Sequence, residues 1–191
     1  TMLFFSIVYF TIWMIVNVAQ SKVNDTRLEA ELQCLEKRPN DVCDLTVIYP
    51  VPVGSLDCDM VTDNRVAYAL ETLPQFSVSS ELTGTKGLLL MFDPDAPVSK
   101  DPQDGFIHFI AIVSVDGNGN VIVQRIITDY YPPSPPRGHG EHRYQYFLYD
   151  DTNGGQISPP SGRKFQLCQF LAKHKIGRQP VASFQFRHIR L

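Results

Sequence analysis

Residues 87–97 read GLLLMFDPDAP, a short apolar run that stops abruptly at two aspartates and two prolines. An apolar run of this length bounded by turn-forming residues is typical of a buried strand, because a buried helix is usually longer. The Asp-Pro-Asp sequence favours a rigid turn directly after it. The stretch therefore predicts a buried strand over Gly87–Phe92 with polar side chains at its end.

Much of the remaining chain repeats this pattern, with short apolar runs separated by Gly, Pro, Asn and Asp. We therefore expect a mainly β fold, with antiparallel, sandwich-like central sheets and a few peripheral helices. Residues 116–120, DGNGN, predict a hairpin turn because Gly and Asn tolerate positive φ. The other expected strands are Leu45–Tyr49, Gln75–Ser79, Ile107–Val115, Val121–Ile127, Tyr144–Tyr149 and Val181–Ile189.

Two helices are expected. Lys164–Ile176 places Phe165, Cys168, Leu171 and Ile176 on one face at helical spacing, and Gly177 supplies a C-terminal stop. His174 then lies on the exposed face of this helix. A second, short helix is expected around Arg27–Glu36.

The N-terminus has the composition of a targeting segment. Residues 2–21 carry no charged side chain and end on a small-x-small sequence, Ala19-Gln20-Ser21. We expect a signal peptide at 1–21, a polar segment at 22–44, a folded domain at 45–191 and secretion from the cell. An uncleaved membrane anchor is the alternative, because the run is nearly long enough to span a bilayer. The sequon at Asn24 predicts a glycoprotein.

Charge and cysteine content narrow the class of protein further. The net charge of the 191 residues is −3 with both signs interspersed, so no basic stripe favours a nucleic-acid partner. A monomer without a cofactor is expected. Four cysteines in a secreted chain are compatible with two disulfides in three possible connectivities, and we expect at least one disulfide. The four are Cys34, Cys43, Cys58 and Cys168, and no Cys-x-x-Cys pair supports zinc or redox chemistry.

A second compact motif, PPRGHGEHRY at residues 135–144, leads into the strand expected from Tyr144. Rigid turns at strand ends let side chains converge on a site. His142 and Tyr144 are two apart and project to one face of a strand, where both offer hydrogen-bond donors. Arg143 points to the opposite face, and we expect it to pair with a carboxylate of the first motif. His108 is expected to share a strand face with the apolar residues Ile110 and Ile112.

The Asp93–Pro97 motif, with His108 eleven residues after Pro97, and the Pro135–Tyr144 motif together resemble the two signatures of the phosphatidylethanolamine-binding proteins. The similarity covers about residues 45–191. It implies a pocket that binds phosphate-type anions such as phosphoethanolamine and phospholipid head groups. It also implies a cis peptide at Ala96–Pro97, and gives Pro97 and Arg143 structural roles. The implied ligand-binding residues are Asp93, Asp95, His108, Pro136, His142 and Tyr144.

Two carboxylates beside an anion need an explanation, because like charges repel strongly away from bulk water. One aspartate shares a proton with the ligand, or holds a histidine cationic, or receives an ammonium group of the ligand. The sequence leaves all three possibilities open.

Two other functional classes compete with ligand binding. An enzyme could use the Asp, His and Tyr side chains as acid and base, or bind a metal through His108, His142 and Asp93. No nucleophile elbow or His-Glu-x-x-His is present, so we expect a protein with neither catalytic residues nor a metal. The other class is an interaction protein that inhibits a serine protease or modulates a signalling partner.

Overall fold

The computed structural model describes residues 43–96, 104–150, 156–177 and 179–191. Several expected features lie outside the described residues: the signal peptide, the polar segment up to residue 42, the helix at Arg27–Glu36, Asn24, Cys34 and the Ala96–Pro97 bond. Within the described ranges, no helix is both long enough and apolar enough to cross a membrane.

The described chain forms two sheets, which confirms the mainly β fold. A three-stranded sheet has the order β2 (Gly54–Ser55), β1 (Leu45–Tyr49) and β4 (Gln75–Val78). A seven-stranded sheet has the order β3-β10-β8-β5-β6-β7, with β9 paired to β6. Its strands are β3 (Val61–Thr62), β5 (Lys86–Asp93), β6 (Asp104–Val115), β7 (Val121–Thr128), β8 (Glu141–Asp150), β9 (Lys164–Gln166) and β10 (Ala182–Ile189). Only β3 and β10 pair in parallel among the described strands, so the expected antiparallel arrangement needs this one correction.

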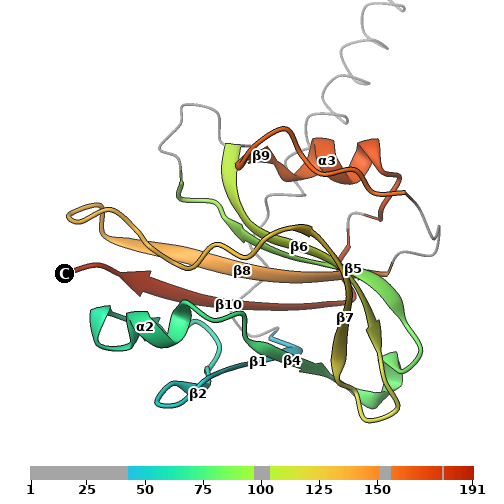
Figure 1. Ribbon diagram of the computed structural model, residues 1–191, viewed down its shortest axis with the longest axis horizontal. Helices are drawn as coiled ribbons and strands as arrows, with labels where there is room; N and C mark the ends of the chain where they lie inside the picture. The colour runs from blue at the N-terminus through green and yellow to red at the C-terminus, as the bar shows by residue number, and fades with distance from the viewer. Residues whose placement is uncertain (1–42, 97–103, 151–155, 178) are drawn as a thin grey trace, which may run out of the picture. The chain divides into compact units, whose positions relative to one another are not determined.

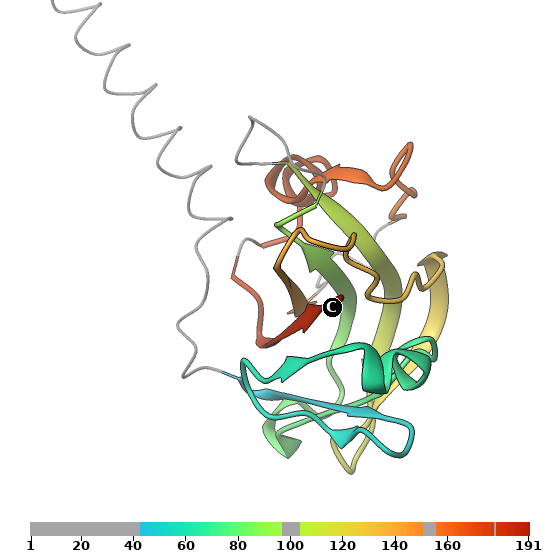
Figure 2. The same cartoon turned by 90° about the vertical axis from the view of Figure 1, so that its left-hand side faces the viewer.

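The large sheet is covered on both faces. The three-stranded sheet and α2 (Ala67–Leu70) lie on one side of it, and α3 (Leu167–Lys173) lies on the other (Figures 1 and 2). In β5, Leu89 and Met91 belong to the core facing the small sheet, whereas Leu88, Leu90 and Phe92 belong to the core beneath α3. Double coverage explains why the β5 sequence is apolar without alternation.

The expected strands are present, with ends that differ by at most three residues from those predicted. The DGNGN turn joins β6 to β7, with Gly119 at a φ of +82° and Asp116 bonded to the backbone N–H groups of Asn118 and Asn120. Besides β2, β3 and β9, the sequence analysis missed α2 and two short 3₁₀ helices, η1 (Asn64–Val66) and η2 (Ser80–Leu82).

The helix predicted at Lys164–Ile176 is wrong at both ends. Lys164–Gln166 forms β9 instead, because its backbone pairs with Asp104–Phe106 of β6. At the other end, Lys175 rather than Gly177 adopts the left-handed conformation, with a φ of +57°. The N–H groups of Lys175 and Ile176 bond back to the carbonyls of Ala172 and Leu171, as in a Schellman motif.

His174 is also not on an exposed face. It is half-buried at the end of α3, with its ring centroid 4.7 Å from that of Phe170. Its Nε2 atom is buried and has no hydrogen-bond partner in the described part of the chain.

Three tyrosine hydroxyls tie the two sheets together. Tyr49 of β1 and Tyr146 of β8 share a hydrogen bond of 2.7 Å, and Tyr130, after β7, lies 3.1 Å from the Tyr49 hydroxyl. Tyr130 donates in turn to the Leu70 carbonyl at the end of α2. These bonds satisfy hydroxyls that are buried or half-buried, and they fix the start of the segment that follows β7.

Cys43 and Cys58 form a disulfide across the β1–β2 hairpin, which confirms the expectation of at least one disulfide. Cys168 carries a buried thiol in α3.

Removing this disulfide should destabilise the domain. It links residues that are 15 apart in sequence. Losing a cross-link of about that span lowers the free energy of unfolding by ~3 kcal/mol. The Cys43→Ala/Cys58→Ala double variant and the reduced wild type should therefore both shift to lower urea midpoints. Equal midpoints for oxidised and reduced wild type would contradict the prediction.

Candidate functional site

The two sequence motifs meet at one end of three adjacent strands. Asp93 ends β5, while His142 and Tyr144 lie near the start of its antiparallel neighbour β8. Alternation along the strands places all three on the face toward the small sheet, together with Met91 of the core. Asp93, His142 and Tyr144 are 1%, 4% and 1% exposed.

His108 reaches the same face through a β-bulge. Met91 pairs with Phe109 and Phe92 with Ile107, so His108 is the extra residue of β6. The expectation that His108 shares a face with Ile110 and Ile112 is therefore wrong, since both isoleucines pack beneath α3. The bulge directs the imidazole toward Tyr144, with ring centroids 5.1 Å apart and edge-to-face.

Asp93 is the centre of this cluster. Its Oδ2 accepts a hydrogen bond from His142 Nδ1 at 2.9 Å, and the same oxygen lies 4.0 Å from His108 Nε2. Its Oδ1 accepts from the backbone N–H of Asp95 at 2.7 Å, which closes the turn at the Asp-Pro-Asp sequence. Of the three explanations for a carboxylate beside an anion, this geometry matches an aspartate that holds a histidine cationic.

Asp95 and Arg143 join the two motifs through an ion pair. The guanidinium bonds both carboxylate oxygens, at 2.7 and 2.5 Å, and the backbone N–H of Arg143 bonds one of them at 2.9 Å. Burial opposes ionisation of Asp95, but the hydrogen bonds from Arg143 outweigh it and lower the pKa. The pairing expected for Arg143 is thus present. It engages the Asp95 carboxylate and links the two motifs.

The two histidines of the cluster differ in their protonation. Burial lowers the pKa of His108 from 6.5 to about 4, although its hydrogen bond to the Tyr131 carbonyl and the Asp93 charge oppose this. The hydrogen bond to Asp93 raises the pKa of His142 above 6.5, against the effect of burial. Near neutral pH, His108 is therefore the neutral imidazole, and His142 is the one that holds a proton more readily.

The segment between β7 and β8 borders the cluster. Burial is the main cause that raises the pKa of Tyr144, and the backbone of Ser134 opposes this effect. Pro136 is exposed in this segment, and its carbonyl accepts a hydrogen bond from the backbone N–H of His139. The His139 ring lies 6.4 Å from that of His142.

His188, assigned to the C-terminal strand by its sequence, lies directly opposite His142 in the β8–β10 pairing. It is buried, and its Nδ1 lies 2.9 Å from Thr62 Oγ1. Burial lowers its pKa to about 4, which makes it a neutral neighbour of the cluster.

Two further residues position the cluster, and the sequence analysis missed both. The Tyr131 carbonyl accepts a 2.7 Å hydrogen bond from His108 Nδ1. Arg163 donates to the carbonyls of Ile107 and Asp129 at 3.0 and 2.9 Å, and its guanidinium lies 5.2 Å from the Tyr131 ring centroid. A lone arginine in a polar segment gives no sequence signal, because its partners are backbone carbonyls distant in the chain.

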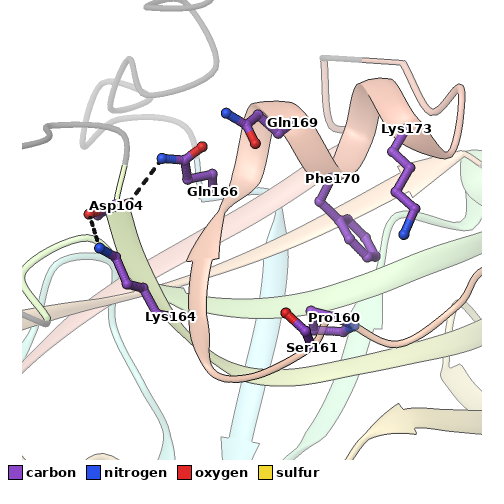
Figure 3. A pocket seen from close by; sticks show the side chains of 8 residues that line it. All are labelled: Asp104, Pro160, Ser161, Lys164, Gln166, Gln169, Phe170 and Lys173. Carbon is purple, nitrogen blue, oxygen red and sulfur yellow. Dashed lines mark hydrogen bonds and ion pairs between the residues drawn. The ribbon is translucent and has the colours of Figure 1, made fainter.

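A wide pocket of about 620 Å³ lies elsewhere, beside α3 (Figure 3). Lys164 contacts the Asp104 carboxylate at 2.7 Å in this pocket, and Gln166 donates to the same group at 3.1 Å. Phe170 and Lys173 of α3 line the other side. The pocket contains none of the residues singled out by the two motifs. The described residues also contain no group of three or more His, Cys, Asp or Glu arranged to hold a metal ion.

The chain is similar to proteins of known family. Residues 56–186 match the model of the family described as phosphatidylethanolamine-binding protein. The chain belongs to this family.

Three solved structures share its fold. A carboxypeptidase Y inhibitor complexed with its cognate proteinase has 19% identity and a TM-score of 0.63, over 90% of this chain and 96% of that chain. The phosphatidylethanolamine-binding protein from Plasmodium vivax has 17% identity and a TM-score of 0.59, over 85% and 97%. CG7054 has 27% identity and a TM-score of 0.56, over 78% and 85%.

The protonation of the cluster can be tested by NMR titration of the imidazole signals. His142 should release its proton above pH 6.5, whereas His108 should stay neutral down to about pH 4. Asp93→Asn should lower the pKa of His142, because a neutral amide favours the imidazolium less than a carboxylate does.

Asp150→Asn, at the far end of β8, is the matched control and should leave both imidazoles unchanged. An unaltered pKa of His142 in Asp93→Asn would show that the pair does not stabilise its charge.

Proposed function

We propose that this family member is a secreted binding protein whose cluster of Asp93, His108, His142 and Tyr144 binds phosphate-type anions. Phosphoethanolamine and phospholipid head groups are the expected examples. The observation that carries the proposal is the His142–Asp93 hydrogen bond beside Tyr144 at the end of the sheet. It leaves Nε2 of His142 and the Tyr144 hydroxyl as the donors for an oxyanion.

The charges around the cluster are compatible with an anion. Asp93 is paired with His142, and Asp95 with Arg143, so each carboxylate has a cationic or protonatable partner. Repulsion of an incoming anion is weakened accordingly. Hydrogen-bond donors can then determine the affinity.

Binding rather than turnover is part of the proposal. The carboxylate of Asp93 is already engaged at both oxygens, which makes it a poor general base in this arrangement. Screening the purified protein against phosphoester substrates should yield no turnover above buffer.

A protein partner is the second candidate. The likeness to a carboxypeptidase Y inhibitor complexed with its proteinase favours it, although the similarity shows the fold alone. Inhibition of a serine carboxypeptidase that survives in the Tyr144→Phe and His142→Ala variants would assign this role to another surface of the domain.

Removing one donor should weaken phosphoethanolamine binding. Tyr144→Phe deletes only a hydroxyl, and one hydrogen bond to a charged group contributes about 1.5–3 kcal/mol, or roughly ten- to over a hundredfold in affinity. His142→Ala should have at least as large an effect. Calorimetry measures both affinities, and urea midpoints check that the sheet remains folded.

Tyr68→Phe is the matched control, because Tyr68 is a 60% exposed tyrosine of α2. Affinity in the wild type should also rise as the pH falls through the raised pKa of His142, because the imidazolium attracts the anion more strongly. Unchanged affinity in both site variants would show that the ligand binds elsewhere.

Secretion has its own test. The uncharged residues 2–21 and the Cys43–Cys58 disulfide support it, since disulfides persist in oxidising compartments. Protein sequencing of culture medium should find a mature N-terminus near Lys22. Recovery only from membrane pellets, with residues 3–19 intact, would contradict the prediction.

A further inference from the structure

We propose that His108 is a specificity-determining residue, whose bare Nε2 atom selects anions that carry a hydrogen-bond donor of their own. The inference rests on the proposed function, because it concerns the same anion site. It predicts that a phosphate monoester is bound as its hydrogen-phosphate monoanion, with the P–OH group donating to His108.

The partner of His108 fixes its tautomer. Nδ1 lies 2.7 Å from the Tyr131 carbonyl oxygen, and a carbonyl can only accept a hydrogen bond. Nδ1 must therefore carry the hydrogen, which leaves a lone pair on Nε2 in the neutral ring. Arg163 supports this arrangement by donating to the carbonyls of Ile107 and His108.

His142 has the opposite character, although it belongs to the same cluster. Its Nδ1 faces the Asp93 carboxylate, which stabilises the doubly protonated ring, so Nε2 of His142 is a donor when the ring is charged. The Tyr144 hydroxyl is a second donor, because burial raises the pKa of this tyrosine and keeps it protonated. The cluster thus presents two donors and one imidazole acceptor.

Asp93 is less available as an alternative acceptor. Its Oδ1 already receives the Asp95 N–H and its Oδ2 receives the His142 N–H. Nε2 of His108 lies 4.0 Å from Oδ2, beyond hydrogen-bond reach. A bound anion without a hydrogen would direct an oxygen lone pair at this nitrogen and leave it unsatisfied.

A matched ligand pair separates donor content from charge. At about pH 5.5, below the second pKa of a phosphate monoester, methyl phosphate and methyl sulfate both carry one negative charge. Only methyl phosphate has an O–H group that can donate a hydrogen bond. Wild-type protein should bind methyl phosphate roughly 10- to 100-fold more tightly by calorimetry, since an acceptor that the bound ligand covers and leaves unsatisfied has a cost of that order.

The His108→Gln variant should lose most of this preference, because its amide can rotate to donate to methyl sulfate. His139→Gln, which changes an exposed histidine near the cluster, is the control and should retain the preference. Should His108→Gln fail to fold, long-range ¹H–¹⁵N correlations of the wild type report the His108 tautomer directly, and a hydrogen on Nε2 would overturn the inference.

Two diesters distinguish a lipid head group from a free monoester. Glycerophosphoethanolamine has ammonium hydrogens to donate and glycerophosphocholine has none. Preference for the first supports the same acceptor in a lipid head group, and failure of both to bind beside tight methyl phosphate supports a monoester ligand. Equal binding of methyl phosphate and methyl sulfate overturns the role of His108 alone, whereas binding of no phosphate ligand overturns the proposed function with it.

Discussion

The buried carboxylate of Asp93 is the constraint on which the rest of the site depends. Placing a charged group away from water costs several kcal/mol unless hydrogen bonds replace its solvation. Here the replacements come from both motifs, through the Asp95 backbone and the His142 ring. The ion pair between Asp95 and Arg143 holds the same two segments together from the outside. The positions of the donors are thus a consequence of solvating one aspartate.

Much of this arrangement can be predicted from the sequence. The unbroken apolar run of β5 indicated a buried strand, and the turn residues after it located the polar end. The spacing of His142 and Tyr144 gave their common face, because strand periodicity is local. The opposed direction of Arg143 followed from the same periodicity, and so did its availability for the first motif.

The remaining features depend on contacts that are not local. The bulge at His108 arises from the register between β5 and β6, so the strand pattern alone put this histidine on the wrong face. Tyr131 and Arg163 act through carbonyls and a ring stack, which no side-chain spacing encodes. Lys164–Gln166 likewise forms β9 because it pairs with β6, although the spacing of apolar residues from Phe165 onward favoured a helix.

The separation of its parts along the chain means that the site exists only in the folded domain. Asp93 and His142 are 49 residues apart, and the pairing of β5 with β8 brings them together. Unfolded chains therefore lack the site, and a ligand that binds it would stabilise the native state against unfolding. By mass action, a ligand at a hundred times its dissociation constant adds about 2.7 kcal/mol to the stability of the native state. A ligand bound there as proposed would therefore couple its own concentration to the stability of the folded protein.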